Sequence, residues 1–160
     1  MNDSHDRPTS APETRNVSEV QEEAGRLSSA ILGIIDLRGE VSKPGPGVSL
    51  CGERDPDRFY SVRHAWSLGK VPVADMKKGM ERLKEELPGK GWKIVRYGPD
   101  SSPSKSLEMV ADATEKNFSV SVRLLDRTKR PKPGAPAALI SVDLTSGCFQ
   151  VPKGKTVDAY

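Results

Sequence analysis

The architecture follows from two stretches of the sequence, Phe118-Ser-Val-Ser-Val-Arg-Leu-Leu-Asp126 and Ala137-Ala-Leu-Ile-Ser-Val-Asp-Leu-Thr145. In each stretch apolar side chains recur at every second position, which is the period of a half-buried β-strand. The segment that joins them, residues 127–136, has the length of a hairpin connection. We therefore expect the two strands to be antiparallel neighbours in one sheet.

The rest of the chain supplies two helices and further strands. A first helix is predicted to start with a capping box of Ser18 and Gln21 and to end near Leu37 and Gly39. Its apolar stripe consists of Val17, Val20, Ala24, Leu27, Ile31 and Ile34. A second helix carries Met76, Met80, Leu83 and Leu87 on one side and stops at Pro88-Gly89. The other predicted strands cover residues 48–52, 60–68, 92–97 and 106–112.

Without the short stretch at 48–52, the order of elements is α-β-α-β-β-β-β. This order predicts an α+β fold with one antiparallel β-sheet and both α-helices packed on one face. We expect residues 1–16 to be a disordered leader, residues 17–151 the single α+β domain, and residues 152–160 a flexible C-terminal tail. No apolar run is long enough to span a membrane, and the first apolar cluster follows residue 16. Neither a transmembrane segment nor a signal peptide is therefore expected in this sequence.

The net charge of +3 comes from one local segment. Residues 127–136 hold four bases and no acid, so the remainder of the chain has a net charge of −1. We predict an anion-binding loop formed by Arg127, Lys129, Arg130 and Lys132. Its candidate partners are an anionic envelope polymer, lipid headgroups or an unknown protein, and the plainer alternative is a solvated loop. A nucleic acid is not expected, because the rest of the chain would oppose a long contact.

The sequence offers little for catalysis. His64 is the one histidine of the predicted domain, and its parity in the strand groups it with Val62 and Trp66, as a packed histidine. Asp55 and Asp57 lack the spacing and the glycine of a calcium loop. We expect no enzymatic activity, no cofactor and no metal site. The enzymatic alternative is a hydrolase with a cleft around His64.

The two cysteines, Cys51 and Cys148, lie 97 positions apart, which excludes a CxxC pair. Two hypotheses remain open from the residues alone. The thiols are either separate and reduced in a cytosolic protein, or they form one structural disulfide in an exported protein.

Three motifs resemble those of the soluble domain of small actinobacterial exported proteins, often lipoproteins. They are Val48-Ser-Leu-Cys51, Leu87-Pro-Gly-Lys-Gly-Trp92-Lys-Ile94 and Ser146-Gly-Cys148-Phe149. The resemblance covers about residues 17–151 and implies that the two cysteines are bonded. It also implies a non-enzymatic binding or scaffold domain that is extracellular or associated with the cell envelope. The alternative is a cytoplasmic protein-binding adaptor or inhibitor with two free thiols.

Overall fold

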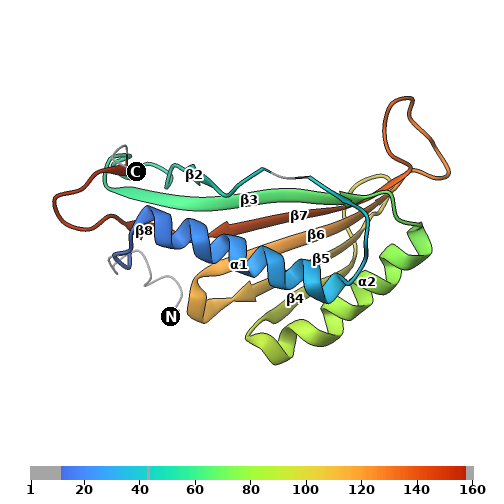
Figure 1. Cartoon of the computed structure of the whole chain (residues 1–160), viewed down its shortest axis with the longest axis horizontal. Coiled ribbons are helices and arrows are strands. Elements are labelled where there is room, and N and C mark those ends of the chain that lie inside the picture. The colour runs from blue at the N-terminus through green and yellow to red at the C-terminus, as the bar shows by residue number, and fades with distance from the viewer. Residues whose placement is uncertain (1–11, 43, 158–160) are drawn as a thin grey trace.

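The computed structural model describes residues 12–42 and 44–157 and has two layers, a broad β-sheet and two α-helices across one of its faces (Figure 1). The predicted α+β class is confirmed. The helices are α1 (Val17–Ile35) and α2 (Val73–Glu86), with short 3₁₀ turns η2 (Leu87–Lys90) and η3 (Thr114–Lys116). The strands are β1 (Glu40–Val41), β2 (Gly47–Ser49), β3 (Phe59–Gly69), β4 (Lys93–Pro99), β5 (Leu107–Ala113), β6 (Phe118–Asp126), β7 (Ala138–Ser146) and β8 (Phe149–Gln150).

The sheet is antiparallel at every pair of these strands and runs in the order β1-β3-β7-β6-β5-β4. Strands β2 and β8 both pair with β3. The predicted hairpin is confirmed as β6 and β7, in register from Phe118 opposite Ser146 to Asp126 opposite Ala138. Because β4 to β7 form a meander, the β4–β5 and β6–β7 loops lie at the same end of the sheet.

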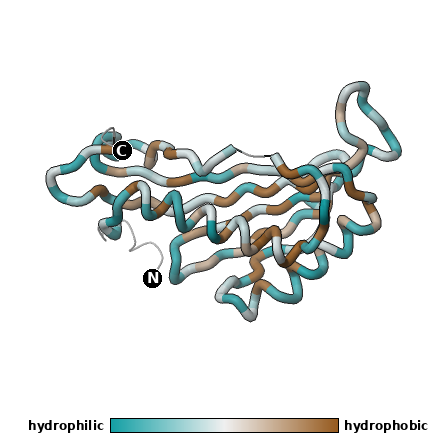
Figure 2. Tube along the Cα trace, in the orientation of Figure 1, coloured by the Kyte–Doolittle hydropathy of each residue, from teal (hydrophilic) through white to brown (hydrophobic). Residues whose placement is uncertain are grey.

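The core lies between the helices and the sheet. Alternate side chains of the central strands are buried against the helices, and Figure 2 shows the matching alternation of hydrophobic and hydrophilic residues along these strands. Helix α1 packs on β3 and β7, and α2 packs on β6 and on α1. Neither described helix lies on the opposite face of the sheet, which holds mostly polar side chains because these occupy the other parity of the strands.

The start of α1 differs from the prediction. Its N-cap is Asn16 rather than Ser18, and Asn16 forms a capping box with Glu19. This shift makes Val17 the first helical residue and buries its side chain to 1% exposure. The helix also ends earlier than expected, at Ile35, with Asp36 in the left-handed conformation (φ 55°).

Helix α2 provides a basic side chain at the C-terminus of α1. No basic residue lies in the last turn of α1, but the guanidinium of Arg82 donates to the carbonyl oxygens of Ile34 and Ile35. A cation at a helix C-terminus satisfies orphan carbonyls and opposes the negative end of the helix dipole. The close crossing is possible because Gly79 faces Ile35, whose Cγ2 would be 3.0 Å from a Cβ at that glycine.

The structure describes only part of the predicted leader and tail. The leader lies outside the described residues up to Ala11, but Thr14 forms a parallel bridge with Gln150, and the N–H of Arg15 donates to the carbonyl of Gln150 at 2.9 Å. In the tail, the N–H of Val157 donates to the carbonyl of Asp57 at 2.9 Å, while residues 158–160 lie outside the description. Backbone hydrogen bonds, which polar composition does not reveal, therefore join the described residues of these two segments to the domain.

Candidate anion-binding site

The β6–β7 connection is a closed loop that projects from one end of the sheet, shown in orange in Figure 1. Its base is closed by a 2.7 Å hydrogen bond from the N–H of Arg127 to the carbonyl of Ala137. Two turns follow inside it, 127–130 and 132–135, each held by a 3.1 Å backbone hydrogen bond. The prolines of this segment fix φ at their positions. The loop therefore has a defined path.

All four predicted bases line one hollow beside this loop. The hollow has a volume of 630 Å³, and Ser104 and Ser106 of the β4–β5 loop line it as well. The bases are Arg127, Lys129, Arg130 and Lys132, the last three of them exposed. The structure thus brings the predicted residues together and adds two hydroxyl groups to their ammonium and guanidinium groups.

One acid, Asp126, lies in the same hollow. Thr128 donates to its Oδ1 from the backbone N–H at 2.9 Å and from the hydroxyl at 2.6 Å. These hydrogen bonds, the hydroxyl first, hold the pKa of Asp126 below its ordinary value. The carboxylate therefore stays ionised and orders the start of the loop, while the four bases outnumber its charge.

The β4–β5 loop is fixed by a buried aspartate. Asp100 is 8% exposed and accepts from the hydroxyl of Ser102 at 2.6 Å and from its N–H at 3.0 Å. The Ser102 hydroxyl is the largest cause that lowers the pKa of Asp100. The hydroxyls of Ser102, Ser104 and Ser106 then follow one another at 3.2 and 3.3 Å. The two serines in the hollow thus belong to an ordered hydroxyl row.

An ion-pair ladder on the open face of the sheet supports this loop. Glu108 is 6% exposed and binds Arg96 from β4 at 2.9 Å and Arg123 from β6 at 3.1 Å. Arg123 also lies 3.7 Å from Asp100. Because buried acids are retained only when they are paired, the ladder fixes β4, β5 and β6 relative to one another directly below the hollow.

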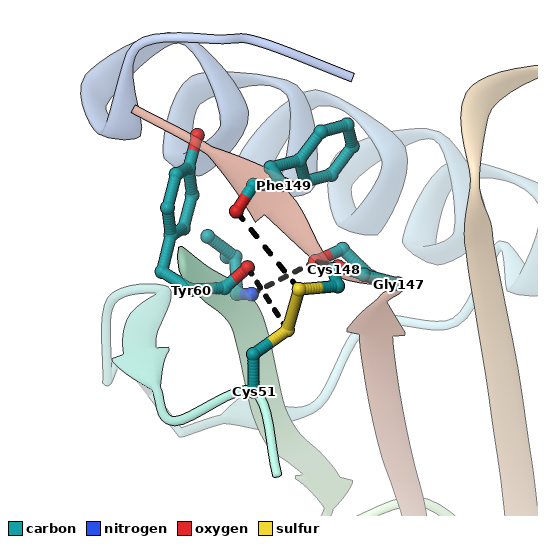
Figure 3. The surroundings of a disulfide bond; sticks show 7 residues. Cys51, Tyr60, Gly147, Cys148 and Phe149 are labelled. Carbon is teal, nitrogen blue, oxygen red and sulfur yellow. Dashed lines mark hydrogen bonds between the residues drawn. A yellow bond between two sulfur atoms is a disulfide. The ribbon is translucent and has the colours of Figure 1, made fainter. Parts of the chain in front are cut away.

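The disulfide lies at the opposite end of the molecule (Figures 1 and 3). Cys51 and Cys148 are bonded, with their Cα atoms 5.8 Å apart, which confirms the pairing that the resemblance implied. Cys148 directly precedes β8, whose Phe149 is buried beside Tyr60 with ring centroids 6.0 Å apart. The bond therefore joins the loop that follows β2 to the strand end that also holds the N-terminal segment.

His64 lies where its parity predicted, beside Trp66 on the helix-covered face. Its Nδ1 is 2.7 Å from the Oγ of Ser28, and its Nε2 is 2.8 Å from the carbonyl oxygen of Pro44. The Nε1–H of Trp66 donates to the same Ser28 Oγ at 3.0 Å. Since a carbonyl only accepts, Nε2 carries the proton, and Ser28 donates to Nδ1. The trio holds the connector at Pro44 against α1 and β3.

Sequence reasoning missed three parts of these sites. It did not find Ser28, although a serine within the apolar stripe of a helix is itself a signal of a buried hydrogen bond. It did not find Ser104 and Ser106, although the parity of a four-strand meander places the first and third loops at one end. The ladder around Glu108 was also missed, because its ion pairs depend on the register between β4, β5 and β6, which the alternation of side chains does not reveal.

Among residues 12–42 and 44–157 no group of three or more His, Cys, Asp and Glu side chains is placed to hold a metal ion. No helix in these ranges is long and apolar enough to cross a membrane. In comparisons with known proteins, no family model, no curated protein and no solved structure matches this chain.

Proposed function

We propose that this chain is a non-enzymatic, exported or envelope-associated binding domain that attaches to anionic material through the β6–β7 loop. The observation that carries the proposal is the convergence of four bases and two hydroxyls on one hollow. The four bases are hydrogen-bond donors, and Arg and Lys are the side chains that recognise phosphate and carboxylate. The second support is the disulfide, since such bonds persist in oxidising compartments.

The contact between Ser28 and His64 gives little support to the hydrolase alternative. Ser28 is 5% exposed, and its Oγ already accepts from Trp66. The second ring nitrogen of His64 is bonded to a backbone carbonyl instead of a carboxylate. A nucleophilic serine needs an accessible Oγ and a base that is free to take its proton.

Binding to a polyanion at several salt concentrations tests the proposal. Counterion release lowers log K with log salt in proportion to the phosphates neutralised, so four bases predict a slope of about −3 for a single-stranded polymer. The wild type should show this slope with inorganic polyphosphate. A variant with Arg127, Lys129, Arg130 and Lys132 replaced by Ala should lose the binding. If the wild type and the four-Ala variant bind polyphosphate equally at low salt, the proposal is wrong and the loop is a solvated connector.

The cytosolic alternative is distinguished by the state of the thiols in cells. An exported domain should show no titratable thiol when it is trapped with an alkylating reagent directly from its native host. An adaptor of the cytoplasm should show two.

A further inference from the structure

The geometry points to a linear phosphate polymer, rather than the headgroup surface of a bilayer, as the partner of the β6–β7 loop. This inference rests on the proposed function and specifies the partner. Three independent features of the described residues carry it: the bases of the hollow, the lack of large apolar side chains on the loop, and the place of the loop relative to the first and last described segments.

The donors of the hollow suit phosphate. Arg127 and Arg130 provide guanidinium groups, which pair with phosphate oxygens in a bidentate manner. The hydroxyl of Ser102 donates to Asp100, so Ser104 donates to Ser102 and Ser106 to Ser104, and this row fixes the part of the hollow's wall beside the bases. A phosphate group has several acceptor oxygens around one centre and can therefore accept from several of the four bases at once. The volume of 630 Å³ falls within the ~300–1,000 Å³ range of small-ligand sites, so the hollow has room for a phosphate together with its neighbours along a polymer.

The loop offers charge but nothing to insert into a bilayer. Residues 127–136 contain no large apolar side chain. The exposed large hydrophobic residues of the described chain are Val48, Leu50 and Val95, none of which lines the hollow. Stable attachment to a membrane takes two signals, and four bases alone give binding only in the roughly millimolar range. A polymer can bind more tightly than this, because repeated phosphates on one chain raise the local concentration of binding sites.

The loop also lies far from the first and last described segments of the chain. It precedes β7, while Cys148 follows that strand, and nine residues of strand span roughly 30 Å. The first and last described segments both lie at the disulfide end, through Thr14 with Gln150 and Val157 with Asp57. Figure 1 shows the loop at the far end of the sheet from β8. An attachment to a surface through either of these described segments would therefore leave the bases facing away from that surface, toward polymer.

The experiment compares four probes with the full chain. They are a short and a long inorganic polyphosphate at equal phosphate concentration, polyglutamate of matched charge, and vesicles of phosphatidylglycerol and phosphatidylcholine. The test variant replaces Arg127, Lys129, Arg130 and Lys132 by Ala, and a charge-matched control replaces the exposed Lys78, Lys90, Lys93 and Lys153 by Ala. If the test variant unfolds, R130A/K132A replaces it.

We expect wild type and control to bind long polyphosphate about tenfold or more tightly than the short polymer, the polyglutamate or the vesicles. The test variant should lose at least tenfold in affinity, and the double variant should lose part of it. Vesicle binding as tight as polymer binding would overturn the inference in favour of headgroups. Equal binding of polyglutamate would overturn the phosphate selectivity while leaving the anion-binding function intact. Failure of every probe would overturn the proposed function itself.

Discussion

At the scale of single residues, the polar trio of Ser28, His64 and Trp66 shows how a small hydrogen-bond network fixes a connector. The segment from Pro44 to Gly47 is rich in proline and glycine and forms few backbone bonds of its own. The ring of His64 reaches its carbonyl at Pro44, and the side chain of Gln21 reaches the carbonyl of Pro46 at 2.9 Å. Two half-buried side chains, rather than a strand ladder, therefore hold the backbone of this connector.

Replacing Ser28 by Ala should destabilise the domain by about 1–3 kcal/mol. The change leaves the indole N–H of Trp66 without its acceptor and the Nδ1 of His64 without its donor, and unsatisfied buried groups have this cost. Urea unfolding measures the effect. The matched control is Ser29→Ala at the exposed next position of α1, which should change stability little, because Ala is the better helix former. Equal effects of the two substitutions would contradict the network.

His64→Gln should likewise lower the midpoint of unfolding, because the imidazole holds the connector through two hydrogen bonds. This variant also separates the structural role from catalysis. Loss of a turnover reaction with an unchanged unfolding curve would show that His64 is catalytic. The measurement is a pair of curves, one for unfolding and one for any hydrolysis found with model esters.

The pKa of Asp100 gives a prediction on pH. Hydrogen bonds from Ser102 depress this pKa in the folded state, so the carboxylate contributes stability above the ordinary Asp pKa of about 3.9. That contribution is lost as the pH falls through the depressed value. Asp100→Asn should therefore destabilise the domain at pH 6, and the difference from wild type should shrink toward pH 3 in urea titrations. A difference independent of pH would argue that packing, rather than charge, is what Asp100 supplies.

At the scale of elements, alternation and helical spacing predicted the two helices and the main strands, because burial on one face imposes these periods. The start of α1 was not predicted correctly, because the sequence contains two overlapping candidates for a capping box, Asn16 with Glu19 and Ser18 with Gln21. The structure selects the first, which brings Val17 into the core. The end of α1 was also not predicted correctly. Asp36, rather than a glycine, takes the left-handed position there, and Arg82 of α2 donates to the last carbonyl oxygens of the helix.

Two glycines should respond to Ala in opposite ways. A Cβ at Gly39, just before β1, would lie 2.2 Å from the carbonyl oxygen of Gly69 and 2.5 Å from Val71, so β1 would have to move. A Cβ at Gly33 in α1 meets nothing within 4 Å. Thermal unfolding should show Gly39→Ala clearly destabilised and Gly33→Ala stabilised by about 0.5–1 kcal/mol, the usual difference between Gly and Ala in a helix. A neutral Gly39→Ala would contradict the pairing of β1.

The disulfide should contribute strongly to stability. Cys51 and Cys148 close a loop of 97 residues, for which chain entropy predicts about 4–5 kcal/mol, or a fall in Tm of roughly 10–15 °C for a protein of this size. The double replacement by Ser tests this in a thermal scan. Wild type treated with reductant should match the double variant. Two free thiols in the mass spectrum of oxidised, non-reduced protein would contradict the bond itself.

At the scale of the whole molecule, the domain has two unlike ends. One end holds the disulfide together with the first and last described segments of the chain. The other end holds the basic loop (Figure 1). The four bases could be predicted because they are neighbours in sequence. Their convergence with Ser104 and Ser106 could not, because it depends on which loops the meander places together and on the ion pairs that buried Glu108 forms with Arg96 and Arg123.

The central claim, that the β6–β7 loop binds anions, is tested most directly by residue-resolved NMR with long polyphosphate added to the full chain. The account predicts amide shifts confined to residues 102–106 and 127–135, saturable, reversed by salt, and absent from the surroundings of Cys51 and Cys148. Shifts that spread evenly over the lysines of the chain, or that centre on the disulfide end, would contradict it.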